Sequence, residues 1–330
     1  MPKDKLKISI ITPVRNEANN LKRYFLGIES IDYPKNCYEL IVVDSNSSDN
    51  TVGKLKEYLD KANFNNTLVP ITSDVGKAVT RKTGAEAAQY ENLLFLDCKC
   101  NIYPDVLQKL NEVNYQPLSA HVIQDATDGS SKNLYDRLFY LGRQRVYKTK
   151  ISKKNKNFYI NKSNFDKVPK GTTMFYCDKK LFLDSQIDNI TDKDNSDDTK
   201  LLWNIVQKKE IIVDERIKVK YFTRDGFWEN IEHMYGRGPR FVDYYYTPSK
   251  AHFWIINLTI IAVAAIIYVL VTGNSRIELL VALLGLNAIF SLFLSKKFSD
   301  FFLVFILWPI FFLTFLLGII KGLIKLPFKK

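Results

Sequence analysis

Two carboxylates stand at the ends of short apolar runs, where an α/β protein commonly holds its ligands. Asp97 follows the run Leu93–Leu96, and Asp44 follows the β-branched run that ends at Val43. Such runs indicate strands that are buried on both faces of a parallel sheet. Ligands of open parallel sheets bind beyond the carboxyl ends of the strands, so both acids could contact a substrate or its metal ion. The alternative is that each acid caps a turn or a helix. Because an Asp occurs at the ends of two strands, we favour contact with a substrate or metal ion over capping.

A third acidic group precedes a predicted helix later in the chain. Asp197 and Asp198 are followed by apolar residues at helical spacing, namely Leu201, Leu202 and Ile205. Carboxylates in a first helical turn also interact favourably with the helix dipole, so helix capping is the alternative to a chemical role.

Strand-like and helix-like segments alternate through the first hundred residues. The predicted strands are 7–12, which Pro13 ends, 38–43, 67–71 and 93–96, and the predicted helices are 17–30, 51–59 and 75–90. Further strands are expected at 119–124 and 170–177, with a helix at 133–147 between them. This alternation predicts βαβ units and an α/β fold with a mostly parallel, Rossmann-like sheet flanked by helices.

Several enzyme classes lack their motifs in this chain. There is no G-x-x-x-x-G-K-[ST] loop and no G-x-G-x-x-G after the first strand, which disfavours P-loop and dinucleotide-binding proteins. The net charge of +12 is concentrated between Arg143 and Lys170, where ten basic residues accompany one acid. This run is either a solvated loop or a surface for anionic lipid or a phosphate-bearing substrate. Nucleic acid is not an expected partner, because no binding motif accompanies the charge.

The sequence becomes mostly apolar after residue 250. The segments 253–271, 277–294 and 301–320 are each long enough to span a bilayer. The first residues contain no apolar signal segment, so we expect the amino-terminal domain to stay in the cytoplasm. Three full spans would then place Lys321 and Lys325 outside, against the positive-inside rule, so one segment could be re-entrant or interfacial. The number of spans stays open at this point.

Four separate motifs together resemble the inverting family 2 glycosyltransferases of GT-A fold. They are Ile8–Glu17 (ISIITPVRNE), Ile41–Thr51 (IVVDSNSSDNT), Arg81–Gly84 (RKTG) and Phe95–Asp97 (FLD), and the resemblance covers about residues 6–245. Members of this family move a sugar from a nucleotide diphosphate donor, usually a UDP-sugar, to a hydroxyl group. The resemblance implies that the donor is bound by Pro13, Val14, Asn16, Glu17, Asp44, Arg81, Asp97 and Lys99. Within this set the turn ending at Glu17 and Asp44 would hold the uridine, and Arg81 would lie near the diphosphate, where a permanent cation suits phosphate oxygens.

The chain departs from the family pattern at the metal-binding motif. Asp97 matches the first acid of the family's D-x-D, but Lys99 replaces the second. Mg²⁺ and Mn²⁺ prefer carboxylate oxygens, and an ammonium group repels them. Three outcomes follow: Asp97 binds the metal with other oxygens, Lys99 neutralises the leaving diphosphate in its place, or activity is lost. A divalent metal at Asp97 is therefore an open expectation.

The resemblance also suggests roles for two later groups. Asp197 and Asp198 match an acidic dyad whose second member, Asp198 here, would be the general base that deprotonates the acceptor hydroxyl. Arg237 and Arg240 match an R-x-x-R-W element of the diphosphate and acceptor side, with Phe241 in place of Trp. The aromatic segment around these arginines also predicts an interfacial helix that is broken at Gly236 and Gly238, in which both arginines could simply bind lipid phosphate.

Together these features predict a multi-pass protein of the cell membrane with a cytoplasmic catalytic domain. Residues 1–226 form the GT-A catalytic domain, 227–250 an interfacial amphipathic segment and 251–330 the transmembrane helices. The expected partners are a nucleotide-sugar donor, the membrane and a lipid-linked saccharide acceptor in surface polysaccharide synthesis. The alternatives are transfer to a polyprenyl phosphate, and a catalytically silent scaffold that retains the fold.

Overall fold

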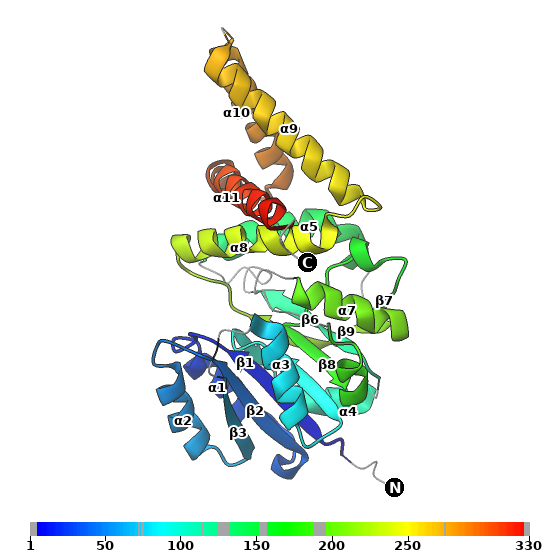
Figure 1. Cartoon of the computed structure of the whole chain (residues 1–330). Coiled ribbons are helices and arrows are strands. Elements are labelled where there is room, and N and C mark those ends of the chain that lie inside the picture. The colour runs from blue at the N-terminus through cyan, green and yellow to red at the C-terminus, as the bar shows by residue number, and fades with distance from the viewer. Residues whose placement is uncertain are drawn as a thin grey trace. The chain divides into compact units, whose positions relative to one another are not determined.

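The first half of a nine-stranded sheet consists of four parallel strands (Figure 1). The computed structural model describes residues 5–71, 73, 76–113, 115–124, 133–151, 157–187, 196–273 and 275–326, and the count of strands refers to these. The four strands have the spatial order β3-β2-β1-β4, and their bounds are β1 (Ile8–Val14), β2 (Tyr38–Ser45), β3 (Asn65–Ile71) and β4 (Asn92–Leu96). Every residue of β1 and β2 is buried, as expected for parallel strands with both faces covered.

Helices cover both faces of this parallel half. The apolar faces of α1 (Leu21–Glu29), α2 (Thr51–Lys61) and α4 (Val106–Val113) share one core with Ile10 and Val42. On the opposite face α3 (Gly76–Ala87) packs against β1 and β2, and Phe182 of α6 (Lys179–Leu183) packs against Phe95 with tilted rings whose centroids are 4.3 Å apart. This is the layered arrangement that the βαβ alternation predicted.

The second half of the sheet is mixed. β8 (Met174–Asp178) runs antiparallel to β4, and the order continues β8-β6-β9-β5. The remaining bounds are β5 (Cys100–Ile102), β6 (Leu118–Gln124), β7 (Phe158–Ile160), which pairs with β9, and β9 (Ile211–Tyr221). Two short 3₁₀ turns, η1 (Lys35–Cys37) and η3 (Phe165–Lys167), and helix α7 (Asp197–Lys208) complete this part.

The helix expected at 17–30 begins only at Leu21, and the strand expected at 170–177 begins only at Met174. Two further details of the expected elements are wrong. The first strand does not stop at Pro13 but continues to Val14. β4 pairs with β1 only as far as Ile11–Phe95, so one side of β1 has no partner strand at Pro13, and a proline is tolerated there. The second detail concerns the segment around Gly236 and Gly238, which forms one unbroken helix, α8 (Phe227–Tyr245), with Pro239 inside it.

The chain divides into two compact units, which are described separately. One comprises Met1–Gly129, Thr149–Lys193 and Asp197–Thr223 and contains the sheet. The other comprises Ser130–Lys148, Asp194–Ser196 and Arg224–Lys330. Its helices are most of α5 (Leu134–Ile151), then α8, α9 (Ala251–Thr272), α10 (Arg276–Leu294) and α11 (Phe298–Lys325).

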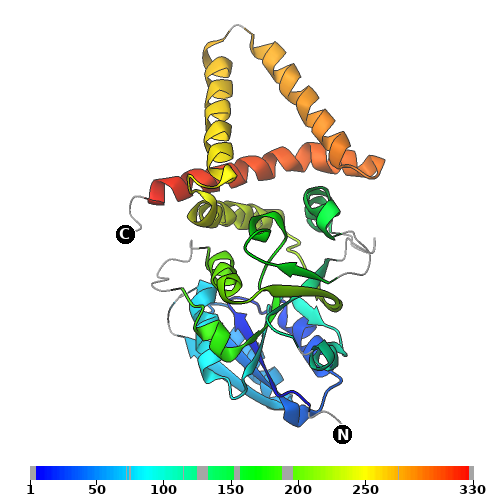
Figure 2. The same ribbon diagram turned by 90° about the vertical axis from the view of Figure 1, so that its right-hand side faces the viewer.

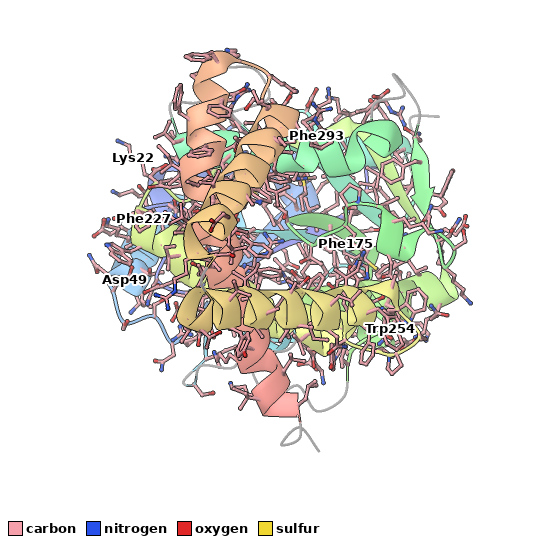
Figure 3. All side chains as sticks on the ribbon, turned by 90° about the horizontal axis from the view of Figure 1, so that it is seen from above. Lys22, Asp49, Phe175, Phe227, Trp254 and Phe293 are labelled. Carbon is pink, nitrogen blue, oxygen red and sulfur yellow. The ribbon has the colours of Figure 1, made fainter. Side chains whose placement is uncertain are left out.

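Among the described residues, α9, α10 and α11 are long and apolar enough to cross a membrane. The apolar side chains of α9 and α10 are mostly exposed, including Trp254 and Phe293, which are both more than half exposed and labelled in Figure 3. Figure 2 shows that α9 and α10 form a hairpin, whereas α11 lies across the base of this hairpin and alongside α8.

Helices α8 and α11 approach each other closely through glycines. A Cβ atom added to Gly238 would overlap the backbone of Gly318, and one added to Gly322 would lie 2.8 Å from the Cα of Pro239. The glycines of α8 therefore serve a tight helix contact rather than a break. At the other end of α11, Asp300 accepts a bidentate pair from Arg137 of α5, with N–O distances of 2.9 and 2.7 Å.

Candidate active site

The carboxyl ends of the parallel strands bring the predicted acids to one edge of the sheet. β1, β2 and β4 run in the same direction, with Val14 opposite Asp44, so the segments after these strands emerge together. Asp44 ends β2, and Asp97 follows β4 directly. We call the side chains gathered there the edge site, and they are Asn16, Glu17, Asp44, Lys77, Arg81, Asp97, Lys99 and Asp198.

Two asparagines shape the turns after β1 and β2. Asn16 and Asn46 both have left-handed backbone angles, with φ of 53° and 54°, a conformation that Asn tolerates better than most residues. The turns are tied together, because the Asn16 N–H donates to Ser47 Oγ at 2.9 Å and the Ser48 N–H donates to Asn16 Oδ1 at 2.8 Å. The predicted donor residues Pro13, Val14, Asn16 and Glu17 therefore belong to β1 and to a turn fixed against the β2 loop.

Asp44 is buried and bonded within its own turn. Its carboxylate accepts hydrogen bonds from the backbone N–H of Ser47 at 3.1 Å and from the Ser47 hydroxyl at 2.5 Å. The turn-capping role considered from the sequence is thus present, and the role in binding uridine stays a prediction.

Lys99 lies inside the site rather than in solvent. Its ammonium is 3.5 Å from Glu17 Oε1, and the two side chains are only 18% and 14% exposed. Burial raises the pKa of Glu17, and the charge of Lys99 offsets this only in part. The residue that replaces the second acid of the motif therefore connects the loop after β4 with the turn after β1.

Both carboxylate oxygens of Asp97 have nitrogen donors. Lys77 of α3 contacts Oδ2 at 2.8 Å, and the Lys99 backbone N–H donates to Oδ1 at 3.0 Å. Burial opposes ionisation of Asp97, but the charge and hydrogen bond of Lys77, with smaller effects from Lys99, together outweigh it and lower the pKa of the carboxyl. Lys77 was not among the predicted site residues. Its position one helical turn before Arg81, on a helix that was predicted, is the signal that could have identified it.

Arg81 forms an ion pair with Asp198, which lies 117 residues later in the sequence. The Arg81 side chain is 4% exposed and donates through Nη1 to Asp198 Oδ1. Burial tends to raise the pKa of Asp198, but the charges of Arg81 and Lys77 and the hydrogen bond from Arg81 together hold the pKa below its ordinary value. Because Lys77 and Arg81 are four residues apart on α3, this helix connects Asp97 with Asp198.

A glycine sets the distance between α3 and the sheet. A Cβ at Gly84 would overlap the Ile11 side chain and lie 3.1 Å from Val43, so glycine allows α3 to approach β1 and β2 closely.

Asp197 and Asp198 begin α7, whose buried residues include Leu201, Leu202 and Ile205 as predicted. Asp197 Oδ1 accepts the Asp198 backbone N–H at 2.9 Å, which is a local bond at the helix start. Arg237 and Arg240 lie on α8 in the other unit, and their acceptor role stays a prediction.

The donors around Asp97 do not suit a divalent cation. Within the described ranges there is no group of three or more His, Cys, Asp or Glu side chains placed to hold a metal ion. Mg²⁺ and Mn²⁺ require several oxygen ligands, whereas Asp97 is contacted by an ammonium and a backbone N–H. Glu17, another carboxylate of the edge site, pairs with Lys99.

The mixed sheet, the covering helices and the acids at the strand ends define a GT-A type fold. The chain belongs to glycosyl transferase family 2, whose family model matches residues 9–182. A mannosyltransferase of Pyrobaculum calidifontis, solved with GDP-Man and Mn²⁺, has a TM-score of 0.64 at 18% identity, covering 98% of this chain and 88% of that one. A 1–349 fragment of TarS from Staphylococcus aureus, solved with UDP-GlcNAc, has a TM-score of 0.51 at 16% identity, covering 72% and 67%. These likenesses show the fold.

Curated relatives extend the comparison by sequence. The dolichyl N-acetyl-α-D-glucosaminyl phosphate 3-β-D-2,3-diacetamido-2,3-dideoxy-β-D-glucuronosyltransferase of Methanococcus voltae is 24% identical over 222 residues, which are 66% of this chain and 67% of that protein. Four further curated relatives match over shorter stretches, and the aligned part is only 26% to 33% of their length.

Proposed function

We propose that this protein is a membrane-anchored inverting glycosyltransferase that moves a sugar from a nucleotide diphosphate donor to a lipid-linked saccharide. The observation that carries the proposal is the Arg81–Asp198 pair. It connects the predicted base, Asp198, to the helix that also contacts Asp97, which brings the base close to two of the predicted donor residues, Arg81 and Asp97.

The proposed reaction is a single displacement at the anomeric carbon. Asp198 accepts the proton of the acceptor hydroxyl while the hydroxyl oxygen of the acceptor forms the new bond to C1 of the sugar. The bond between C1 and the diphosphate oxygen breaks on the opposite face, and the nucleoside diphosphate leaves with the bonding electron pair. Asp198 is 42% exposed, which suits a base that must meet an incoming hydroxyl group.

The donor is proposed to be a UDP-sugar, on the resemblance of the Pro13–Glu17 turn and Asp44 to the family's uridine-binding motifs. The TarS fragment holds UDP-GlcNAc, whereas the Pyrobaculum mannosyltransferase holds GDP-Man. The first experiment therefore supplies both UDP- and GDP-sugars.

The acceptor is proposed to be lipid-linked because the chain carries apolar helices and the Methanococcus relative is named for a dolichyl-phosphate-linked sugar. Transfer to a polyprenyl phosphate itself is the second candidate, because it needs the same donor chemistry and the same membrane position. The surface-polysaccharide context remains part of the proposal.

We further propose that only the hairpin of α9 and α10 spans the membrane, with α8 and α11 in the interface. Phe227 approaches Phe311 with ring centroids 6.3 Å apart, and Gly238 approaches Gly318, so the two helices lie side by side over several turns. A spanning α11 would draw the charges of α8 into the bilayer, at a cost of about 2.5–3.5 kcal/mol for each Arg, Lys or Asp at its centre. Two spans also leave Lys250, Lys296, Lys297, Lys321 and Lys325 on the cytoplasmic side and Arg276 alone outside, as the positive-inside rule favours.

The test uses the full-length protein in lipid nanodiscs with UDP- and GDP-sugars. Polyprenyl-diphosphate-linked saccharide and polyprenyl phosphate are offered as separate acceptors, and labelled sugar is measured in the lipid phase. Transfer to the saccharide with inversion at C1 supports the proposal. Transfer to polyprenyl phosphate alone favours the second candidate, and nucleotide binding without turnover on any acceptor favours a silent scaffold.

A further inference from the structure

The cations of the edge site are arranged where the family pattern would place a metal. Lys99 occupies the position of the second acid of the motif, and its ammonium lies between the loop after β4 and the turn after β1. Lys77 reaches the first acid, Asp97, from α3 at 2.8 Å. The Lys77 ammonium thus contacts the carboxylate that would otherwise hold the metal, and Lys99 contacts the other oxygen of that carboxylate through its backbone N–H while its ammonium pairs with Glu17.

We infer that Lys77 and Lys99 together replace the divalent metal in this chain, binding the diphosphate of the donor and stabilising it as it leaves. This inference rests on the proposed function and specifies how its donor is held.

Each of the three cations of the edge site pairs with a carboxylate before any ligand binds, and the fourth acid, Asp44, is bonded to Ser47. Three ion pairs lie there, namely Lys77–Asp97, Lys99–Glu17 and Arg81–Asp198. A diphosphate brings negative charge of its own, and each of these cations can exchange its carboxylate for phosphate oxygens. Charge-assisted bonds from ammonium and guanidinium groups to phosphate are among the strong hydrogen bonds of proteins. The site therefore offers three positive charges to the ligand without any added ion.

The two lysines differ in exposure, which suggests a different role for each. Lys77 is 56% exposed at its side chain, and its flexible stem can follow a diphosphate as it moves away. Lys99 is 18% exposed and is held by Glu17, so it is the fixed member of the pair. When the bond between C1 and the diphosphate oxygen breaks, the new negative charge on that oxygen develops next to these ammonium groups.

The deciding experiment measures binding of UDP, UMP, GDP and GMP to the full-length protein in detergent by titration calorimetry, with EDTA or with Mn²⁺. We expect the better-bound diphosphate to have the same Kd in both conditions within about twofold. Lys77→Gln and Lys99→Gln should each weaken its binding at least tenfold while changing binding of the matching monophosphate less. Lys82→Gln is the matched control, because Lys82 lies on the same helix, is 52% exposed and pairs with Glu86 instead.

A second variant tests whether metal dependence can be introduced at position 99. Lys99→Asp restores the second acid of the motif, and we expect its diphosphate binding to become weak in EDTA and to recover with Mn²⁺. Loss of wild-type diphosphate binding in EDTA, with recovery in Mn²⁺, would overturn the inference and leave the proposed function intact. Unchanged ratios of diphosphate to monophosphate affinity in the two Gln variants would also overturn it. Absence of nucleotide binding under every condition would contradict the proposed function itself, and the inference with it.

Discussion

Arg81 and Asp198, which are 117 residues apart in the sequence, form an ion pair at the carboxyl edge of the sheet. The pair holds the predicted base in its ionised form but also occupies it, because the guanidinium bonds the same carboxylate that must accept a proton. On the proposed mechanism the diphosphate competes for Arg81 and leaves Asp198 available to the acceptor. We therefore expect the pair to link donor binding to activation of the base.

Replacing the base should remove turnover without removing the donor. We expect Asp198→Asn to lower kcat at least 100-fold, because general base catalysis typically contributes about 10²–10⁴-fold. Nucleotide affinity, measured by calorimetry on the same preparation, should be retained or become stronger, because Asp198→Asn removes the charge that competes with the diphosphate for Arg81. Asp184→Asn is a control, since Asp184 is an exposed acid paired with Lys180. A variant with wild-type turnover would show that Asp198 is not the base.

The pH dependence of turnover should report the Arg81 charge. Arg81 lowers the pKa of Asp198, so Asp198 in the free wild-type enzyme stays ionised through the neutral range and loses its charge only in strong acid. Removing the cation in Arg81→Gln leaves burial as the main influence, which raises the pKa. The acid limb of kcat/KM should therefore move to higher pH in this variant, whereas Arg81→Lys should keep it closer to the wild-type position. An identical acid limb in all three proteins would contradict the coupling.

Gly84, three residues after Arg81 on α3, should be important for stability. Gly84→Ala places a methyl group into the Ile11 side chain, and overpacking of this kind costs about 1–3 kcal/mol. We expect a lower Tm and weaker nucleotide binding, because α3 carries both Lys77 and Arg81. Gly171→Ala is the matched control, since its nearest neighbour would lie 3.9 Å away. Equal Tm values for the two variants would show that α3 can shift without cost.

Membrane topology distinguishes two spans from three. Reporter fusions after Gly273 and after Lys325 should lie on opposite sides of the membrane if only α9 and α10 span it. The fusion after Lys325 should share the side of a fusion at the amino terminus. A reporter after Lys325 on the far side would contradict an interfacial α11, and it would make α11 the third span.

The parts of the fold that could be predicted are those that local pattern specifies. Buried strands such as β2 and β4 are runs of apolar and β-branched residues, and helices such as α7 have apolar positions at a period of 3.6. The position of Asp44 and Asp97 at strand ends followed directly from these runs. The continuous α8 could not be predicted, because the reason for its glycines is a contact with α11, about 80 residues later.

The sequence by itself therefore determined the family, the strand ends and the acids placed on them, since each depends on residues that are neighbours along the chain. Only the tertiary structure decided which cation meets which carboxylate. Lys77–Asp97, Lys99–Glu17 and Arg81–Asp198 join residues separated by 20, 82 and 117 positions, and such pairs form only where α3, the turn after β1 and the start of α7 reach the same edge of the sheet. Pairing of this kind depends on packing across the whole sheet, for which no local pattern in the sequence exists.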